Sequence, residues 1–276
     1  MKNALEIRMF TYYTIIGKDI NLLKGHIKNV KWWAGFDKLE CEKELLVIVY
    51  KNDNIPAHVT SEIVDWCLTN HIRVHVFEEP NDIFLNNLYT CWNLGYKQAK
   101  DGWVFRGGSD QAFSKDSFLH LYRLAEENKD RKVVLQANTI ENRERLQKMN
   151  VVSRHFMMNL GNNFEDFDLR KFDFYVNHIN KGVKKELLNI QDSLRIWKKP
   201  GKLRTSLGEI DRVDGCSWLM KKNEWEKYGP LEPLWNGITG DVLIHDRMQK
   251  DGYEEFIVRD CVTYHFVQGE SKRHWK

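Results

Sequence analysis

Hydrophobic stretches alternate with amphipathic segments along the first third of the chain. Short apolar runs predict strands at residues 7–14, 45–50 and 74–77. Apolar positions at three- and four-residue spacing predict helices at residues 19–28 and 59–70. This alternation of strands and helices is typical of a mainly parallel sheet that carries helices on both faces. The pattern therefore predicts an α/β fold.

A further helix leads into a strand that is followed by a carboxylate. The apolar face of this helix consists of Leu88, Trp92, Tyr96 and Ala99. Gly102 breaks the helix before the apolar strand at residues 103–105, and Asp110 comes just past the strand end. Ligands of open α/β sheets gather at the carboxyl ends of strands, so Asp110 can face a ligand or its metal ion. Alternatively, Ser109 and Asp110 are turn or helix-cap residues.

Two later elements also place a polar residue at one end. Asp241 directly precedes a predicted helix at residues 242–250, where it could serve as the N-cap. An apolar strand that starts at Val262 ends on His265, and a lone histidine at a strand end is often a structural residue. Earlier in the second half of the chain, a short helical pattern covers residues 187–197.

The composition is that of an ordinary globular protein. The 276 residues are 42% hydrophobic and 12% aromatic, which suits one large α/β domain or two small ones. No apolar run reaches the roughly 18 residues of a membrane helix, and residues 1–8 lack the apolar core of a signal peptide. We therefore expect a soluble cytoplasmic protein, in the host cytoplasm if the protein is viral. The 5 cysteines form no CxxC pair, so neither a zinc site nor a disulfide framework is expected.

Basic residues gather at two places, although the formal net charge is only +3. The clusters comprise Lys198, Lys199, Lys202 and Arg204, and then Lys272, Arg273 and Lys276. Such clusters are often solvated surface. Together with the nearby Trp197, His274 and Trp275, these clusters would also suit a phosphate-rich partner such as a nucleic acid, whose bases can stack on aromatic rings.

The segment from Asn93 to Asp110 resembles the stretch that leads into the metal-binding DxD motif of GT-A glycosyltransferases, particularly their family-two group. The likeness rests on Asn93-x-Gly95, on Ala99 with Gly102, and on the strand that ends in Ser109-Asp110. Gly108 stands where that family has its first Asp. The resemblance therefore implies one metal ligand here, Asp110, and a GT-A-like, Rossmann-related parallel sheet.

Residues 213–229, followed by Gly240-Asp241, are similar to the back half of the same family, where a small-residue acceptor loop and a helix precede an "ED" pair. Gly240 replaces the Glu of that pair. The resemblance implies that Asp241 is the catalytic base, which in inverting members takes the proton from the acceptor hydroxyl. The implied acceptor-side residues are Asp214, Gly215, Trp218 and Arg247.

The strand that ends on His265 resembles the late H-x-x-x-G-x-S segment of the family, whose histidine joins the metal or closes over the diphosphate. A cation held by Asp110 and His265 would neutralise the departing nucleoside diphosphate. Mn²⁺ suits a mixed oxygen and imidazole set better than Mg²⁺ does, so the expected cofactor is Mn²⁺ or Mg²⁺.

The residues implied to meet the donor lie in the first half of the chain. They are Thr11, Tyr13, Asp53, Asn93, Arg106 and Ser109. Other interpretations remain open, because Tyr13 could be a buried sheet aromatic and Asp53 a turn residue. Arg106 would meet the diphosphate if its side chain points into the site.

The resemblance implies a single GT-A-like catalytic domain over residues 1–276. Residues 1–125 would form the nucleotide-sugar half and residues 126–276 the acceptor half. The expected activity is metal-dependent transfer of one sugar from a nucleotide diphosphate sugar, with UDP favoured, to a hydroxyl with inversion. The acceptor is a glycan, a lipid-linked sugar or, as an alternative, a hydroxymethylated or already glycosylated base of viral DNA.

Two other classes of protein have to be compared with these sequence features. A non-catalytic sugar- or nucleotide-binding module is an alternative because Gly108 and Gly240 replace two acids of the family. A dinucleotide-binding oxidoreductase is excluded because no Gly-x-Gly-x-x-Gly follows the first strand. The absence of a Gln-x-x-Arg-Trp signature speaks against a processive polysaccharide synthase.

Overall fold

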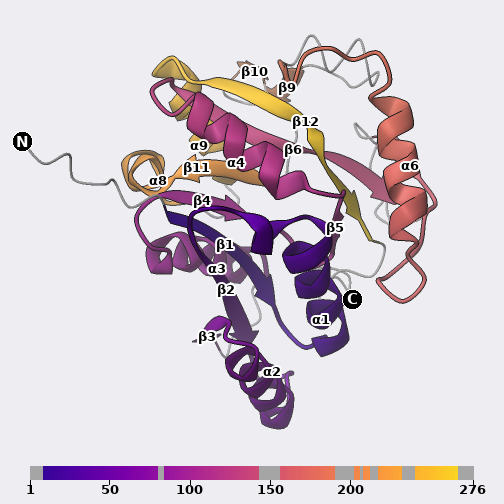
Figure 1. The fold of residues 1–276 in the computed structure, drawn as a ribbon. Coiled ribbons are helices and arrows are strands. Elements are labelled where there is room, and N and C mark those ends of the chain that lie inside the picture. Colours follow the sequence, from indigo (N-terminus) through magenta and orange to yellow (C-terminus); the bar gives the residue numbers. More distant parts are fainter. Residues whose placement is uncertain are drawn as a thin grey trace, which may run out of the picture.

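The computed structural model describes residues 9–79, 84–142, 156–189, 202–205, 208–211, 217–231 and 240–266. Ten strands of this part form one sheet (Figure 1). They are β1 (Met9–Ile16), β2 (Glu42–Lys51), β3 (Arg73–Glu78), β4 (Trp103–Arg106), β5 (Gln111–Phe113), β6 (Val133–Asn142), β7 (Phe156–Met158), β8 (Leu187–Leu188), β11 (Trp218–Lys221) and β12 (Glu254–His265). A separate hairpin joins β9 (Lys202–Thr205) to β10 (Gly208–Asp211).

The helices alternate with the strands. They are α1 (Ile20–Lys28), α2 (Ala57–Thr69), α3 (Phe84–Gln98), α4 (Ser117–Glu127), α6 (Leu169–Ile179), α8 (Lys222–Tyr228) and α9 (Gly240–Lys250), with a π-helical turn η1 (Asn29–Trp33) and a 3-10 turn η2 (Phe36–Lys38) after α1. Asp19 caps α1 by accepting a hydrogen bond from the Leu22 amide at 3.0 Å. The expected strands and helices of the first third are therefore all present, with ends shifted by a few residues.

The main sheet has the strand order β3-β2-β1-β4-β11-β6-β12-β5. β3, β2, β1 and β4 are parallel neighbours, and β6 and β12 are parallel to each other. β11 runs antiparallel between β4 and β6, so β4, β6 and β12 all point the same way. This arrangement confirms the mainly parallel α/β sheet, and it brings the carboxyl ends of β4, β6 and β12 to one edge.

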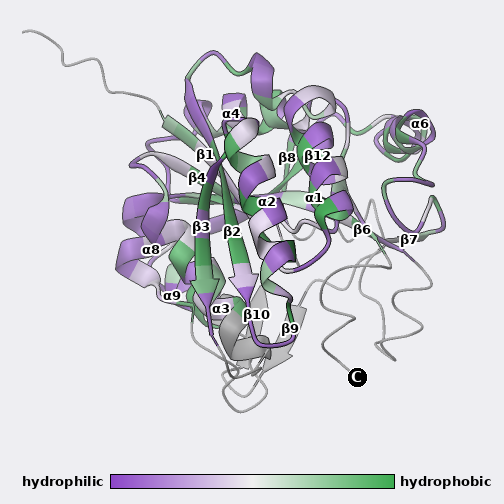
Figure 2. Cartoon of the chain, turned by 90° about the horizontal axis from the view of Figure 1, so that it is seen from below, coloured by the Kyte–Doolittle hydropathy of each residue, from purple (hydrophilic) through white to green (hydrophobic). Residues whose placement is uncertain are grey.

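Side chains of the sheet alternate between two hydrophobic layers. In β1, Phe10 and Tyr12 pack with α1, α2 and α4 on one face, whereas Tyr13 packs with α3, α8 and α9 on the other. A third cluster, which includes Phe172 of α6 and Tyr264 of β12, closes the end of the sheet near α6. Much of β1, β2 and β3 is green in Figure 2, whereas the outer sides of the helices carry most of the purple. Helices on both faces therefore hold the strand ends in fixed positions.

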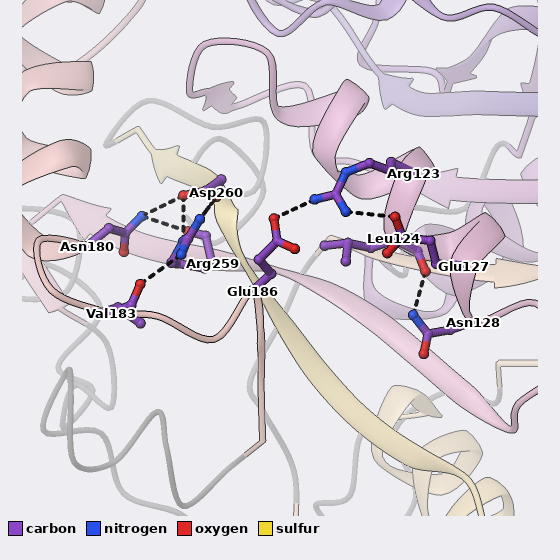
Figure 3. A network of polar contacts seen from close by, with 9 residues as sticks. All are labelled: Arg123, Leu124, Glu127, Asn128, Asn180, Val183, Glu186, Arg259 and Asp260. Atoms are coloured by element: carbon purple, nitrogen blue, oxygen red, sulfur yellow. Dashed lines mark hydrogen bonds and ion pairs between the residues drawn. The ribbon is translucent and has the colours of Figure 1, made fainter.

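A network of polar contacts surrounds the middle of β12, around Arg259 and Asp260 (Figure 3). Here the register between β12 and β6 shifts between Val258 and Val262. Arg259 in this bulge forms an ion pair with Asp260 at 2.5 Å, and Asn180 donates to the Arg259 carbonyl at 2.8 Å. Nearby, Arg123 of α4 contacts Glu186 at 2.5 Å. These contacts fasten α4 and the segment before β8 to the strand that carries His265.

Some expectations need correction or lie outside the described residues. The helix expected over residues 187–197 is wrong at its start, because Leu187 and Leu188 form β8 and pair with Val258 and Ile257 of β12. Four cysteines are free thiols and three of these are buried; Cys216 lies outside the described residues. In the described part of the chain, no helix is long and apolar enough to cross a membrane.

Candidate metal and donor site

The loop between β4 and β5 places Asp110 at the carboxyl edge of the sheet. The Gly107 amide donates to the Tyr13 carbonyl at 3.1 Å, which continues the β1–β4 pairing into the loop. The Gln111 amide then donates to the Gly108 carbonyl at 3.2 Å, and the Gly108 amide donates to the Gln111 side chain at 2.9 Å. The loop is thus a closed turn with Asp110 at its end.

Glycine is needed in this turn for space. A Cβ atom on Gly107 would lie 2.2 Å from the Tyr12 hydroxyl, and one on Gly108 would lie 2.7 Å from Asp110 Oδ1. Ser109 and Asp110 lie in a turn, as the alternative interpretation had it, and the N-cap position of α4 is taken by Asp116. Gly108 therefore contributes no carboxylate to the loop, but its lack of a side chain leaves room for the carboxylate of Asp110.

Asp110 meets His265, which is 155 residues away in the sequence. His265 Nε2 lies 3.0 Å from Asp110 Oδ2, and His265 Nδ1 lies 3.0 Å from Glu141 Oε1. The side chains of His265 and Glu141 are each 6% exposed and that of Asp110 is 13% exposed. The imidazole thus lies between two carboxylates at the edge where β4, β6 and β12 end.

The possible metal ligands at this edge of the sheet fit a divalent cation that the protein coordinates only in part. Asp110 offers a carboxylate oxygen and His265 an imidazole nitrogen, and this mixed pair suits Mn²⁺. In the parts of the chain that the structure describes, no three His, Cys, Asp or Glu side chains are placed so that all three could bind one metal ion. Asp110 and His265 would therefore leave most coordination positions to ligand oxygens and water.

A buried histidine supports the turn from below. His26 of α1 lies with Nδ1 2.8 Å from the Gln111 carbonyl and with Nε2 2.6 Å from the Tyr12 hydroxyl. Because a carbonyl only accepts, Nδ1 is the donor and Nε2 accepts from Tyr12. Burial lowers the pKa of His26 to about 4, against a smaller opposing effect of the Gln111 hydrogen bond and the Asp110 charge. The imidazole is therefore neutral at pH 7 and fixes the backbone beside Asp110.

Several residues expected to contact the donor have structural partners instead. Thr11 is fully buried and donates to Glu44 at 3.0 Å. Tyr13 is also fully buried and donates to the Trp92 carbonyl at 3.0 Å, so the alternative of a buried sheet aromatic describes it. Asn93 holds the Leu231 backbone from both sides, donating to its carbonyl at 2.8 Å and accepting from its amide at 2.7 Å.

The other three residues of this set differ in exposure. Arg106 is 1% exposed, and its Cζ lies 4.0 Å from the centre of the Trp92 ring and 4.6 Å from that of Trp218. Aromatic faces therefore hold the guanidinium inside the protein. Ser109 is buried in the loop beside Asp110, and Asp53 is exposed in the turn after β2.

The residues expected on the acceptor side are only partly described. Trp218 is fully buried and stacks on His245 of α9 at 4.3 Å between ring centres, so it supports the site from inside. Arg247 of α9 donates to the Tyr228 carbonyl at 3.0 Å and so links α9 to the end of α8. Asp241 lies in the first turn of α9, which begins at Gly240; its side chain, like Asp214 and Gly215, lies outside the described residues.

Comparison with solved structures finds glycosyltransferases along nearly the whole chain. GalNAc-T7 with UDP, GalNAc and Mn²⁺ matches with a TM-score of 0.55 and 12% identity, over 96% of this chain and 45% of that chain. Mannosyltransferase PcManGT from Pyrobaculum calidifontis, in complex with GDP-Man and Mn²⁺, matches with a TM-score of 0.51 and 13% identity, over 96% and 59% of the two chains. S. aureus TarS 1-349 matches with a TM-score of 0.51 and 14% identity, over 94% and 60%.

The chain has the GT-A fold. At these identities the likeness concerns the fold alone, and the chain spans 45% to 60% of the length of the proteins it matches. Sequence comparison finds neither a matching family model nor a matching curated protein. On this GT-A sheet, Asp110 and His265 lie 3.0 Å apart.

Glu141 is the site residue of the GT-A sheet that sequence reasoning missed. It lies near the end of β6, where its register partner in β12 is His265. A signal was present only in part, because Glu141 and Asn142 close a strand that opens with the apolar residues 133–135 but carries further polar residues along its length. The partner strand, however, follows more than a hundred residues later, and the sequence pattern does not reveal which strands pair.

Proposed function

We propose that this chain is a metal-dependent glycosyltransferase that moves one sugar from a nucleotide diphosphate sugar to an acceptor hydroxyl. The observation that carries the proposal is the meeting of Asp110 and His265, 3.0 Å apart, at the carboxyl edge of a GT-A sheet. Two proteins of the same fold, GalNAc-T7 and PcManGT, were crystallised with Mn²⁺ and a nucleotide or nucleotide sugar. Residues 1–276 would then act as one catalytic unit, with the donor held by the first half.

Asp110 and His265 would hold the cation, Mn²⁺ in preference to Mg²⁺, and the diphosphate oxygens would complete its coordination. A bound divalent cation would supply positive charge where the leaving diphosphate gains negative charge. Ser109 is buried in the loop next to Asp110. Because Arg106 is buried against Trp92 and Trp218, its part is to shape the floor of the site beneath the loop.

Asp241 is the proposed base that takes the proton from the acceptor hydroxyl. It lies in the first turn of α9, and Ile244 and Met248 of this helix are buried against the sheet. The contact from Arg247 to the Tyr228 carbonyl adds a second anchor. These contacts fix the direction of the helix and hence the place of its first turn. Direct attack by the deprotonated acceptor would invert the anomeric carbon, so we propose an inverting enzyme.

The decisive experiment measures nucleotide diphosphate release from a panel of UDP-, GDP- and TDP-sugars, with Mn²⁺ or with EDTA. We expect one donor to be consumed only with Mn²⁺, and Asp110→Asn and Asp241→Asn to lower the rate by about 100-fold or more. UDP-sugars are the favoured donors. NMR of the product's anomeric proton then distinguishes inversion from retention.

Matched controls are available for both substitutions. Asp246→Asn alters a carboxylate of α9 that pairs with Lys250 at 2.6 Å, and Asp116→Asn alters one that pairs with Lys38 at 2.6 Å. Both should retain activity. Asn also tolerates the left-handed backbone that Asp116 adopts, with φ 56°. No metal-dependent binding of any nucleotide, together with no release, would refute the glycosyltransferase proposal.

The two alternatives make different predictions. A non-catalytic binding module would bind a nucleotide sugar with no turnover for Asp241→Asn to remove. A DNA acceptor would show binding that weakens steeply as salt rises. In the β9–β10 hairpin, the register places Lys202 opposite Asp211 and Arg204 opposite Glu209.

A further inference from the structure

Glu141 and His265 are brought together by the backbone of the sheet. β6 and β12 are parallel, and Glu141 and His265 are partners in their register, as are Thr139 and Thr263. Side chains of paired residues project to the same face of a sheet. The Thr263 and Thr139 hydroxyls are 3.2 Å apart on that face, just before the Glu141 contact. The position of the Glu141 carboxylate is therefore set by strand pairing.

The contact orients the imidazole. Glu141 Oε1 lies 3.0 Å from His265 Nδ1, and this interaction directs the opposite nitrogen, Nε2, to Asp110 Oδ2 at 3.0 Å. The side chains of Glu141 and His265 are buried, so water competes little for either group. A carboxylate that accepts the free N–H of a metal-binding histidine fixes its tautomer and raises its basicity.

Glu141 also restores charge to the site. Gly108 stands where the resembling family carries an acid, so the loop itself offers only the carboxylate of Asp110. Glu141 brings a second carboxylate to the far side of the same imidazole. Because this part of the site is poorly hydrated, the negative charge of Glu141 favours the binding of a cation beside His265.

We propose that Glu141 is a positioning residue of the cation site, which holds His265 with Nε2 toward the metal and compensates for the acid absent at position 108. The inference rests on the proposed metal-dependent function. Glu141 acts through His265, since its contact is with the nitrogen that faces away from Asp110.

Mn²⁺ binding tests the proposal without any assay of activity. Electron paramagnetic resonance counts free Mn²⁺ during titration of the full chain, with Mn²⁺ alone as the probe. We expect Glu141→Ala to weaken binding by about 10- to 100-fold. Glu141→Gln should weaken it less than Glu141→Ala, because the amide oxygen can still accept from Nδ1–H and only the charge is lost.

The chain offers a matched control. Glu255 of β12 is a buried carboxylate that also contacts a buried histidine, His245, away from Asp110. Glu255→Gln should leave Mn²⁺ affinity within about twofold of wild type. Thermal unfolding of the same samples reports the structural cost of each substitution. A structural role would lower the unfolding temperature without the graded loss of Mn²⁺ affinity.

The outcomes separate the two proposals. Saturable Mn²⁺ binding by wild type, together with unchanged affinity in folded Glu141→Gln and Glu141→Ala proteins, would overturn the role of Glu141 and leave the glycosyltransferase proposal intact. Equal losses in both variants would overturn positioning, because only charge would then matter. No Mn²⁺ binding by wild type would overturn the role of Glu141, and the donor panel would then decide the glycosyltransferase proposal separately. If Glu141→Ala does not fold, Glu141→Gln alone decides: unchanged affinity overturns the proposal, and a loss absent from Glu255→Gln supports it.

Discussion

Gly95 is a glycine inside helix α3 whose missing side chain is required by packing. A Cβ atom there would lie 2.1 Å from Cε2 and 2.3 Å from Cδ2 of Tyr13. Tyr13 cannot easily move away, because it is fully buried, its hydroxyl is bonded to the Trp92 carbonyl, and its ring packs edge-on against Tyr96. The Asn93-x-Gly95 pattern that resembles glycosyltransferases thus has a physical reason in the contact between α3 and β1.

We predict that Gly95→Ala destabilises the protein although alanine is the better helix former. The helix would gain about 1 kcal/mol from propensity. Overpacking of a buried ring costs about 1–3 kcal/mol, and a 2.1 Å contact places this site at the severe end. Urea unfolding should therefore show a lower free energy of unfolding for Gly95→Ala than for wild type. Lys97→Ala, at an exposed site of α3, should change this free energy by less than about 0.5 kcal/mol. A more stable Gly95→Ala protein would contradict the packing argument.

His26 makes the stability of the folded protein sensitive to acid. Its pKa is lowered from 6.5 to about 4 because burial disfavours the charged imidazolium. The unfolded chain therefore binds a proton more readily, so stability is retained above pH 6.5 and falls as pH decreases toward 4. The pKa shift of His26 corresponds to a loss of about 3 kcal/mol in the free energy of unfolding between pH 6.5 and pH 4.

We predict that His26→Gln reduces the loss of stability between pH 6.5 and 4. Unfolding free energies measured in urea at several pH values would show a shallower dependence for the variant than for wild type. His58→Gln, which replaces an exposed histidine of α2, serves as the comparison and should follow wild type. Parallel profiles for wild type and His26→Gln would show that another group controls the acid sensitivity.

Individual site residues differ in how far the sequence reveals them. Asp110 follows an apolar strand and His265 ends one, so both stand out in the sequence, and the structure places them 3.0 Å apart. Glu141 does not stand out, because its importance comes from strand register. For Tyr13 the sequence left two interpretations open, a ligand contact and a buried sheet aromatic, and the structure places its hydroxyl inside the core, where it donates to the Trp92 carbonyl.

Helix α9 is joined to the sheet by a buried polar network. His245 Nδ1 contacts Glu255 Oε1, and Gln136 of β6 donates to Glu255 Oε2 at 3.0 Å. The side chains of His245 and Glu255 are 1% and 3% exposed. Glu255 thus connects α9, β12 and β6, and it determines how the helix that carries Asp241 lies on the sheet.

We predict that Glu255→Ala costs about 3–5 kcal/mol of stability, because removal of one member strands the buried partners His245 and Gln136. The double variant Glu255→Leu/His245→Leu should recover part of this loss, since apolar residues of similar size often replace a buried polar pair at low cost. Urea unfolding measures both. A loss below about 1 kcal/mol for Glu255→Ala would show that the network contributes little.

Elements with strong local patterns were predicted well from the sequence. The helix at residues 19–28 has both an apolar face and Asp19 as its cap, and α1 matches it closely. The segment from Leu187 had a helical pattern but begins as a two-residue strand, because pairing with Ile257 and Val258 of β12 decides its conformation. Such pairing is nonlocal and overrides weak propensity.

The candidate site draws on strands from both halves of the chain, so a ligand bound there should stabilise the whole molecule. We predict that UDP with Mn²⁺, at about 100 times the dissociation constant, adds about 2.7 kcal/mol. The melting temperature should then rise by roughly 5–10 °C. EDTA or Asp110→Asn should remove the metal-dependent part of the rise, whereas Asp116→Asn should keep it. If UDP has no effect, the same test applies to the nucleotide selected by the donor panel.

The order of strands across the molecule could not be read from the sequence. Alternation correctly predicted a parallel sheet, and β3, β2, β1 and β4 fit it. The insertion of β11 between β4 and β6, antiparallel to both, leaves no periodic signal, because a short buried strand is apolar in either direction. The resemblance to glycosyltransferases implied a mainly parallel sheet and did not place β11 either.

The central place of β12 has a consequence for the newborn chain on the ribosome. β12 is the last strand of the described chain, yet it lies between β6 and β5, just as the late strand β11 lies between β4 and β6. The strands β4, β5 and β6 are therefore synthesised well before the neighbours that cover their edges. Unpaired edges invite association with other chains. The interval between translation of residues 142 and 265 is thus when a nascent chain most needs protection by chaperones.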